Sequence, residues 1–467
     1  MPKRFIILGF AIGFFTLTTL FSQENKGCIS EKMLVDLQKS FQNTTSDKAI
    51  LNAIANNDIN KLALNLSNSD LNDTYFSHKV KTKGITNQKS SGRCWMFSGM
   101  NILRAKFIAK YNPEKFEFSQ NYLFFWDQLE KSNLFLQAVI DTRNKDFNDK
   151  TVEWLFKNPI GDGGQFTGMI DLVTKYGLVP KEAMPETNSS ENTTRMTNLI
   201  SLKLREYGLE LREKATQKGM KEDALIQRKT EMLTNIYRML ALNLGVPPTT
   251  FTWTLKDANG KPVSTKEYTP KSFYQEFVNE DLSTYIMFMN DPTREYYKVY
   301  EIEYDRHMYD GLNWKYINLP IDDIKEMAMQ SIKDSTALYF SCDVGKYYNR
   351  DNGTLDLNNF DYESLMGITF GMNKKQRIQS FASSSSHAMT LCGVDINKNG
   401  KPLKWLLENS WGLTGYNGYL IMTDDWFNEY MFRLVVEQKY VKKEILDLLK
   451  TESVKLPPWD PMFALEE

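Results

Sequence analysis

The chain has 467 residues, of which 42% are hydrophobic, so it can bury a sizeable core, and its length allows two or three domains. Its 57 basic and 58 acidic residues leave a formal net charge of −1. This near-neutral total gives no electrostatic argument for binding nucleic acid or an acidic membrane surface. Four cysteines in a chain of this length exclude a disulfide scaffold.

The first residues are typical of an export signal. Pro2-Lys3-Arg4 is a short basic segment, and residues 5–21 form a continuous apolar or small-residue stretch. The pattern predicts a secretory signal peptide over residues 1–22, cleaved near Ser22 or Gln23, and hence an exported protein in the periplasm or outside the cell. A membrane anchor formed by an uncleaved signal is the alternative, because about 17 apolar residues approach the length that spans a bilayer. With the signal removed, we expect no membrane span.

Residues 23–69 are polar and rich in Asn and Ser, with short helical patches such as Glu31–Phe41. We expect a loosely attached leader that contains Cys28. Two further cysteines, Cys342 and Cys392, stand in apolar runs that resemble strands, and we interpret them as buried structural thiols. Because no cysteine pair has ligand spacing and the three histidines are dispersed, we predict no metal site, and nothing in the sequence calls for a cofactor.

Cys94 follows a glycine-containing loop and precedes an apolar, helix-compatible run, 95–108. A thiolate at a helix N-terminus is stabilised by unpaired backbone N–H groups and by the helix dipole, which lower its pKa. Gln88, six residues earlier, could donate a hydrogen bond from its amide to a developing oxyanion. A lone cysteine is more often a small buried hydrophobic residue, so Cys94 becomes a candidate nucleophile only together with partners elsewhere in the chain.

Two candidate partners stand near the C-terminal end. His387 precedes an apolar run, 388–394, that reads as a buried strand, and Asn409 ends a second apolar strand 22 residues after His387. A Cys, a later His and a later Asn suit a thiolate–imidazolium pair whose imidazole is oriented by an amide. His307 stands among charged and aromatic residues, and we interpret it as structural.

The middle of the chain is helical and then strand-rich. Residues 193–244 have the apolar spacing of two helices separated near Gly219, and the stretches 250–255 and 263–268 flank a turn and predict a hairpin. Apolar runs with Gly and Asn punctuation predict strands at 337–342, 387–394, 404–409 and 418–422.

Taken together, these residues resemble the papain superfamily of cysteine peptidases, and within it the bleomycin hydrolase and aminopeptidase C branch. His387 comes 293 residues after Cys94, against roughly 130 to 150 in papain, which implies a large insertion that the branch shares. The resemblance runs from about residue 70 to the C-terminus. It is carried by Gln88, the segment 91–95, His387-Ala388, Asn409-Ser410-Trp411-Gly412, and the branch segments 161–166, 175–180, 342–346 and 457–462.

The resemblance implies an α+β, papain-like fold with a helical lobe and a β-barrel-like lobe on either side of a cleft. The chain would then consist of a signal peptide (1–22), a polar leader (23–69), a helical lobe with Cys94 (70–190), an inserted helical and hairpin subdomain (191–330), a β-rich lobe with His387 and Asn409 (331–455) and a C-terminal tail that reaches the cleft (456–467).

The resemblance also implies a mechanism. Cys94 would attack the scissile carbonyl, His387 would protonate the leaving amine, and Asn409 would orient the imidazole. Gln88 and the backbone N–H of Cys94 would form the oxyanion hole. Trp411 would shield the imidazole–amide hydrogen bond, with an ordinary core position as the alternative. For the substrate, the resemblance implies contacts with Gly163 and Gly164.

In the family, the chain-end carboxylate meets the free amine of the substrate and makes the enzyme an aminopeptidase. The tail of this chain departs from the family pattern, with Phe463 after the Met and two glutamates, Glu466 and Glu467, at the end. Glu467 is the candidate anchor; use of a glutamate side chain and processing of the tail are alternatives. The expected activity is release of N-terminal amino acids from peptides. An endopeptidase and a catalytically silent scaffold of the same fold are the alternatives, and a homohexamer is implied by resemblance alone.

Overall fold

The computed structural model describes residues 27–68, 73–218 and 220–463, and the chain divides into two compact units, Met1–Ala63 and Leu64–Glu467. The predicted signal peptide and Glu467 lie outside the described residues. The described part of the first unit contains the helices α1 (Glu31–Ser40), α2 (Thr45–Asn56) and α3 (Ile59–Ala63).

Local capping defines the first two helices. The hydroxyl of Ser30 accepts a hydrogen bond from the backbone N–H of Met33 at the start of α1. Thr44 and Asp47 form a capping box at the start of α2. In these two described helices no side chain is buried, so their side chains contribute little to a core.

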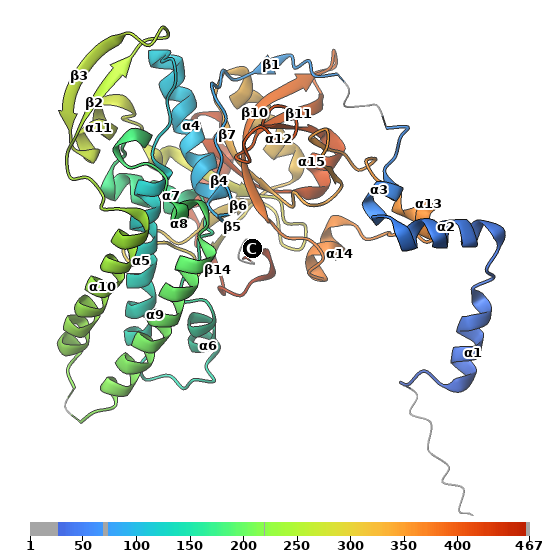
Figure 1. Cartoon of the computed structure of the whole chain (residues 1–467), viewed down its shortest axis with the longest axis horizontal. Helices are drawn as coiled ribbons and strands as arrows, with labels where there is room; N and C mark the ends of the chain where they lie inside the picture. The colour runs from blue at the N-terminus through green and yellow to red at the C-terminus, as the bar shows by residue number, and fades with distance from the viewer. Residues whose placement is uncertain (1–26, 69–72, 219, 464–467) are drawn as a thin grey trace, which may run out of the picture. The chain divides into compact units, whose positions relative to one another are not determined.

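The second unit joins a group of helices to one large sheet (Figure 1). Its helices are α4 (Cys94–Tyr111), α5 (Gln120–Asp141), α6 (Lys150–Lys157), α7 (Phe166–Tyr176), α8 (Asn188–Glu191), α9 (Thr194–Ala215), α10 (Glu222–Leu244), α11 (Pro270–Phe277), α12 (Ile321–Lys333), α13 (Tyr362–Met366), α14 (Lys374–Gln379), α15 (Asp424–Tyr430) and α16 (Lys443–Asp447). Short 3₁₀ helices are η1 (Lys181–Ala183), η2 (Leu282–Thr284), η3 (Gln438–Tyr440), η4 (Leu448–Lys450) and η5 (Pro461–Phe463).

The strands of the large sheet follow the order β14-β5-β6-β4-β13-β7-β10-β11-β12-β9-β8, with β1 paired to β10. They are β1 (His78–Lys79), β4 (Tyr285–Met289), β5 (Lys298–Ile302), β6 (Lys315–Asn318), β7 (Leu338–Cys342), β8 (Tyr348–Asn349), β9 (Thr354–Leu355), β10 (His387–Ile396), β11 (Pro402–Glu408), β12 (Tyr419–Thr423), β13 (Met431–Glu437) and β14 (Val454–Leu456). The hairpin of β2 (Phe251–Lys256) and β3 (Pro262–Tyr268) forms a separate two-stranded sheet.

The central strands of the sheet are covered on both faces. In β7, Tyr339 belongs to the buried cluster of the helical half, whereas Leu338 and Phe340 belong to a second cluster that includes residues of α12 and α15. This alternation follows from the two-residue period of a strand. On the helical side, α5, α9 and α10 run side by side as long helices, and α4 lies between them and the sheet (Figure 1).

Helix α4 is buried along most of its length, from Cys94 to Ile108, because it packs against β10 and β7 on one side and against α5 and α7 on the other. Gly99 permits the close approach of α7, since a Cβ at this position would lie 2.9 Å from Cε of Met169. The helix predicted over 95–108 is therefore confirmed, and it begins at the cysteine itself.

Several other expectations agree with the observed elements. The hairpin, the two long helices of 193–244 and the four predicted strands are present, while β13, which lies between β4 and β7, was not predicted. Residues 285–318, placed in the inserted subdomain by the sequence, supply β4, β5 and β6 to the large sheet. Cys342 and Cys392 are buried and form no disulfide, and burial raises the pKa of the Cys392 thiol.

Candidate active site

Cys94 is the first residue of α4, its side chain is 3% exposed and it forms no disulfide. Asp162 holds the chain on both sides of this cysteine. The Asp162 carboxylate accepts a hydrogen bond from the N–H of Gly92 (N–Oδ2, 2.6 Å), and the Asp162 carbonyl accepts one from the indole of Trp95 (Nε1–O, 2.9 Å). The loop that contains Asp162 therefore helps to set where the thiol sits at the helix N-terminus.

His387 is the first residue of β10 and is buried beside Asn409 and Trp411. Its Nε2 lies 2.8 Å from Oδ1 of Asn409, and the Trp411 ring stacks on the imidazole with centroids 4.5 Å apart and planes 27° from parallel. The Asn409 oxygen also accepts the backbone N–H of Ser410 at 2.8 Å, which sets the orientation of the amide. Nε2 of His387 is therefore the donor, and in the neutral ring Nδ1 is left with a lone pair that can take a proton.

Burial controls the protonation of this imidazole. Loss of hydration lowers the pKa of His387 to about 4, and the hydrogen bond that the imidazole donates to Asn409 opposes that shift only in part. The neutral ring is thus the favoured form near pH 7. A neighbouring thiolate is the kind of charge that favours the imidazolium.

The N-terminal part of α4 packs against the first half of β10. Oγ1 of Thr390 donates to the carbonyl of Ser98 at 3.2 Å, and Cys94 and Ala388 belong to the same buried apolar cluster. These contacts bring together the elements that carry the predicted nucleophile and the predicted base, although the two residues are 293 positions apart in sequence.

Gln88 is tied to the residue that follows Asn409. Its Oε1 accepts the hydroxyl of Ser410 at 2.6 Å, its backbone N–H donates to the Ser410 carbonyl at 2.8 Å, and its Nε2 donates to the Ser91 carbonyl at 2.7 Å. The amide nitrogen carries two hydrogens, so one more N–H can serve an oxyanion. Its part in the oxyanion hole, like the roles of Cys94 and Asn409, remains a prediction.

Gly163 and Gly164 lie in the same loop as Asp162. Nζ of Lys131 donates to the carbonyls of Gly163 (2.6 Å) and Gly161 (3.1 Å) and so holds the loop against α5. A Cβ at Gly164 would clash with the imidazole of His307, which explains why this position has no side chain. Packing is thus a sufficient reason for Gly164, and its contact with substrate stays a prediction.

His307 is buried away from Asn409 and pairs with a different residue. Its Nδ1 lies 2.5 Å from Oδ1 of Asp127, and its ring meets Trp95 edge-on with centroids 4.6 Å apart. Burial and the charge of Lys131 lower the pKa of His307, whereas the charge of Lys131 and the hydrogen bond to His307 hold the pKa of Asp127 below its usual range despite burial. This position fits the structural role that the sequence suggested for His307.

The tail is anchored through its last described residues. Asp460 forms an ion pair with Arg294, and Nη2 of Arg433 donates to the Met462 carbonyl at 3.2 Å. Met462 itself is buried in an apolar cluster with residues of the sheet. The position of Glu467, the candidate amine anchor, lies beyond these described residues.

Some contributors were not identified from the sequence. Ser410 is part of the Asn409-Ser410-Trp411-Gly412 motif, but nothing in the sequence indicated its hydrogen bond to Gln88. Asp162 is part of the branch segment 161–166, whereas no sequence pattern singles out Lys131.

Within residues 27–68, 73–218 and 220–463, no group of three or more His, Cys, Asp or Glu residues is arranged to hold a metal ion. In the same ranges, no helix combines the length and the apolar character needed to cross a membrane.

Comparison with known proteins identifies relatives over nearly the whole chain. The family model of the Peptidase C1-like family matches residues 28–463. The chain is 42% identical to bleomycin hydrolase of Mus musculus over 404 residues (84% of this chain, 89% of that protein). It is 38% identical to aminopeptidase C of Lactobacillus delbrueckii subsp. lactis over 405 residues (85% and 90%). The crystal structure of PepW from Lactobacillus rhamnosis HN001 aligns with a TM-score of 0.91 at 36% identity, covering 94% of this chain and 99% of that one.

Proposed function

This chain belongs to the Peptidase C1-like family, and we infer from that premise that it is a cysteine-type aminopeptidase that releases N-terminal amino acids from peptides. The fold is the papain-like one that the sequence predicted. The observation that carries the mechanism is the hydrogen bond from His387 Nε2 to Asn409 Oδ1, because it leaves Nδ1 as the ring atom that can move a proton.

The proposed reaction uses Cys94, His387 and Gln88. The thiol proton of Cys94 passes to Nδ1 of His387, and the sulfur attacks the scissile carbonyl carbon to form a tetrahedral oxyanion. Nε2 of Gln88 and the backbone N–H of Cys94 donate to that oxygen. His387 then protonates the leaving amine, and the C–N bond breaks. Water activated by His387 hydrolyses the thioester and restores the thiol.

Gly163 and Gly164 are proposed to bind the backbone of the substrate. Their loop is linked to the residues on both sides of Cys94 through Asp162 and is braced from behind by Lys131. A braced loop beside the nucleophile suits substrate positioning, because small displacements of a bound peptide cost much of the rate.

The tail is proposed to act as the ruler that restricts cleavage to the N-terminal residue. Arg433 supports this placement, because it binds the Met462 carbonyl and also lines the pocket beside Gly163 and Gly164. A carboxylate of the remaining residues, with Glu467 as the first candidate, would then pair with the free amine of the substrate. A side-chain carboxylate of the tail and a processed chain end are the alternatives.

Two fluorogenic peptides of equal sequence, one with a free and one with an acetylated N-terminus, test the activity under reducing conditions. We expect cleavage of the free peptide only, loss of that cleavage with a thiol alkylator, and no turnover by Cys94→Ala with an unchanged circular dichroism spectrum. Equal cleavage of both peptides would establish an endopeptidase. No cleavage of either by reduced protein with an intact C-terminus would support a silent scaffold.

The role of the tail has its own test. Truncation after Met462 removes Glu466 and Glu467 and moves the chain-end carboxylate back to Met462, while keeping the ion pair of Asp460 with Arg294. We expect the truncated protein to cleave the acetylated peptide, which the full chain leaves intact. An unchanged preference for the free amine after truncation would contradict the ruler.

Export and assembly are proposed on separate grounds. The basic and apolar pattern of residues 1–22 supports export with cleavage near Ser22 or Gln23, and the mature N-terminal sequence of secreted protein would test it. A membrane-bound product with an intact N-terminus would establish the anchor instead. The resemblance to the bleomycin hydrolase branch supports a homohexamer. Light scattering coupled to size exclusion would distinguish a hexamer from a single 54.3 kDa chain.

A further inference from the structure

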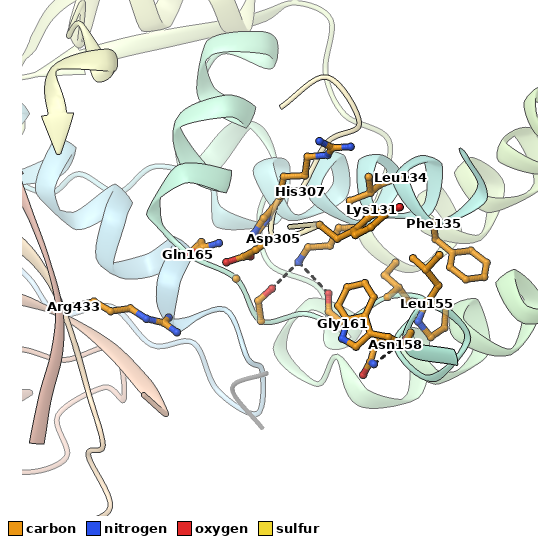
Figure 2. A pocket seen from close by; sticks show the side chains of 17 residues that line it. Lys131, Leu134, Phe135, Leu155, Asn158, Gly161, Gln165, Asp305, His307 and Arg433 are labelled. Carbon is orange, nitrogen blue, oxygen red and sulfur yellow. Dashed lines mark hydrogen bonds between the residues drawn. The ribbon is translucent and has the colours of Figure 1, made fainter. Parts of the chain in front are cut away.

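A pocket opens beside Gly163 and Gly164, and it is lined by α5, α6, the loop 158–165 and the segment 304–307 (Figure 2). Figure 2 shows Leu134, Phe135 and Leu155 toward one end and Gln165 and Arg433 toward the other. One end of the pocket is therefore mainly apolar, with Asn158 beside Leu155, and the other end is polar.

Apolar and aromatic side chains line the apolar end of the pocket. Leu134, Phe135 and Leu155 are buried, while Trp154 and Tyr304 are half-buried and face each other with ring centroids 6.1 Å apart. Binding of an apolar ligand group to such walls is favourable, because it removes apolar surface from water.

Lys131 also lines the pocket, but its charge is already neutralised. Its Nζ lies 3.0 Å from the carboxylate of Asp127 and donates to the carbonyls of Gly161 and Gly163. The ammonium is thus engaged by the protein itself, and the wall that it contributes to a ligand is mainly its alkyl stem.

Gln165 supplies an independent sign that the pocket takes a polar partner. Its side chain is 3% exposed, and neither its amide oxygen nor its amide nitrogen has a hydrogen-bond partner in the described part of the chain. Although Gln165 is the N-cap residue of α7, its side chain makes no capping bond. Buried amides that stay unpaired are costly and rare, and the natural complement of an amide is a peptide group, which has both a donor and an acceptor.

The pocket lies next to the residues that flank the nucleophile. Its His307 contacts Trp95, and its Gly163 follows Asp162, which binds both Gly92 and Trp95. A peptide held for attack by Cys94 therefore has this pocket within reach of the residue at its scissile bond.

We propose that this pocket is a specificity site that receives a large apolar side chain of the residue donating the scissile carbonyl, while Gln165 hydrogen-bonds to a peptide group of the same substrate. The proposal rests on the aminopeptidase function and names its substrate class: peptides that begin with Phe, Leu, Met or Trp. Substrates that begin with Gly leave the apolar end empty and are poor ones.

Filling the pocket tests the apolar end. A Cβ at Gly161 meets no atom of the described residues within 4 Å, so Gly161→Leu places a side chain at the pocket wall without a clash with them. We expect it to lower kcat/KM for Phe- and Leu-aminomethylcoumarin at least 10-fold and for Gly-aminomethylcoumarin less than 3-fold. Gly371→Leu is the matched control, because Gly371 also has open space and does not line the pocket, and it should change none of these values. An equal loss on all three substrates with Gly161→Leu would overturn the assignment.

Gln165→Met tests the polar end of the pocket through two measurements, Tm and kcat/KM. A structural role and a substrate-binding role of Gln165 predict opposite results for them. Removing a buried amide that has no partner in the described part of the chain should leave Tm unchanged or raise it, while kcat/KM for the Phe substrate falls at least 5-fold. A lower Tm with unchanged kcat/KM would show that Gln165 serves the fold.

Binding separates this proposal from the proposed function. Calorimetric titration of Cys94→Ala with phenylalaninamide and with glycinamide requires no turnover, and we expect at least 10-fold tighter binding of phenylalaninamide. Equal affinities would reject the pocket even if the enzyme is an aminopeptidase. A clear preference in a protein that cleaves neither fluorogenic peptide would retain the pocket and reject the activity.

Discussion

Arg104 on α4 forms a buried ion pair with Glu408, the last residue of β11 and the neighbour of Asn409. Glu408 is 1% exposed, and its burial raises the pKa of the carboxyl, an effect that Arg104 opposes. Arg104 also donates to the Gly84 carbonyl at 3.1 Å. The pair links the helix that begins at Cys94 to the strand that leads to Asn409. Because buried ion pairs add little net stability, we expect its main effect to be to fix the position of this helix relative to the strand.

Breaking this pair should be costly, whereas replacing it should not. Arg104→Met leaves a buried carboxylate without its cation, and we expect a loss of roughly 3–5 kcal/mol in the free energy of unfolding. The double variant Arg104→Met/Glu408→Leu should recover most of that loss. Urea unfolding of the two single variants and the double variant measures the coupling, and simple additivity would contradict a direct pairing.

The stability of the protein should fall in acid because of His387. Its pKa is about 4 in the folded chain, against 6.5 for the ordinary group, so between these values the unfolded chain binds a proton that the folded chain does not. Unfolding therefore becomes easier as the pH falls from about 6.5 to about 4, by roughly 3 kcal/mol in total. Urea unfolding of Cys94→Ala, which has no thiolate, should show this slope, and Cys94→Ala/His387→Gln should lose most of it. Equal slopes in the two proteins would contradict the depressed pKa.

Trp411 should hold His387 in its dry environment. Removing the ring with Trp411→Ala admits water to the imidazole, so the pKa of His387 should rise from about 4 toward its ordinary value, whereas Trp411→Phe keeps a stacked ring and should shift it less. Titration of the imidazole resonances by NMR in the Cys94→Ala background measures this directly. An unchanged pKa in Trp411→Ala would return Trp411 to an ordinary core role.

Ser410 should act on catalysis through Gln88. The hydroxyl of Ser410 holds Oε1 of Gln88 at 2.6 Å, so Ser410→Ala removes one of the two hydrogen bonds that fix this amide and leaves the one to Ser91. We expect kcat to fall about 10-fold with a smaller change in KM. Gln88→Ala should cost about 10²–10³ in kcat, as the loss of an oxyanion donor does. Adding Ser410→Ala to Gln88→Ala should then cost nothing further. A full additional 10-fold loss in the double variant would mean that Ser410 acts by another route.

Secondary-structure elements could be predicted where the residues that specify them are neighbours in sequence. The helix that begins at Cys94, the strand that begins at His387 and the hairpin of 251–268 follow from apolar spacing and turn residues, which are properties of neighbouring positions. The strand β13 and the inclusion of residues 285–318 in the large sheet were not predictable in this way, because strand pairing joins segments that are distant in sequence.

The sequence by itself determined which reactive residues the chain contains and in which order: Gln88, then Cys94 six residues later, and then His387 and Asn409. This order resembles that of one peptidase family. The tertiary structure decided which atoms meet. It placed Nε2 of His387 on Asn409, Trp411 over the ring and Ser410 on Gln88, and it placed Gln165, whose amide has no partner among the described residues, in a pocket with apolar walls. The reason is physical: residue identity supplies donors, acceptors and nucleophiles, whereas burial and hydrogen-bond geometry depend on contacts between segments that are separated in sequence, by 22 residues for His387 and Asn409 and by 322 for Gln88 and Ser410.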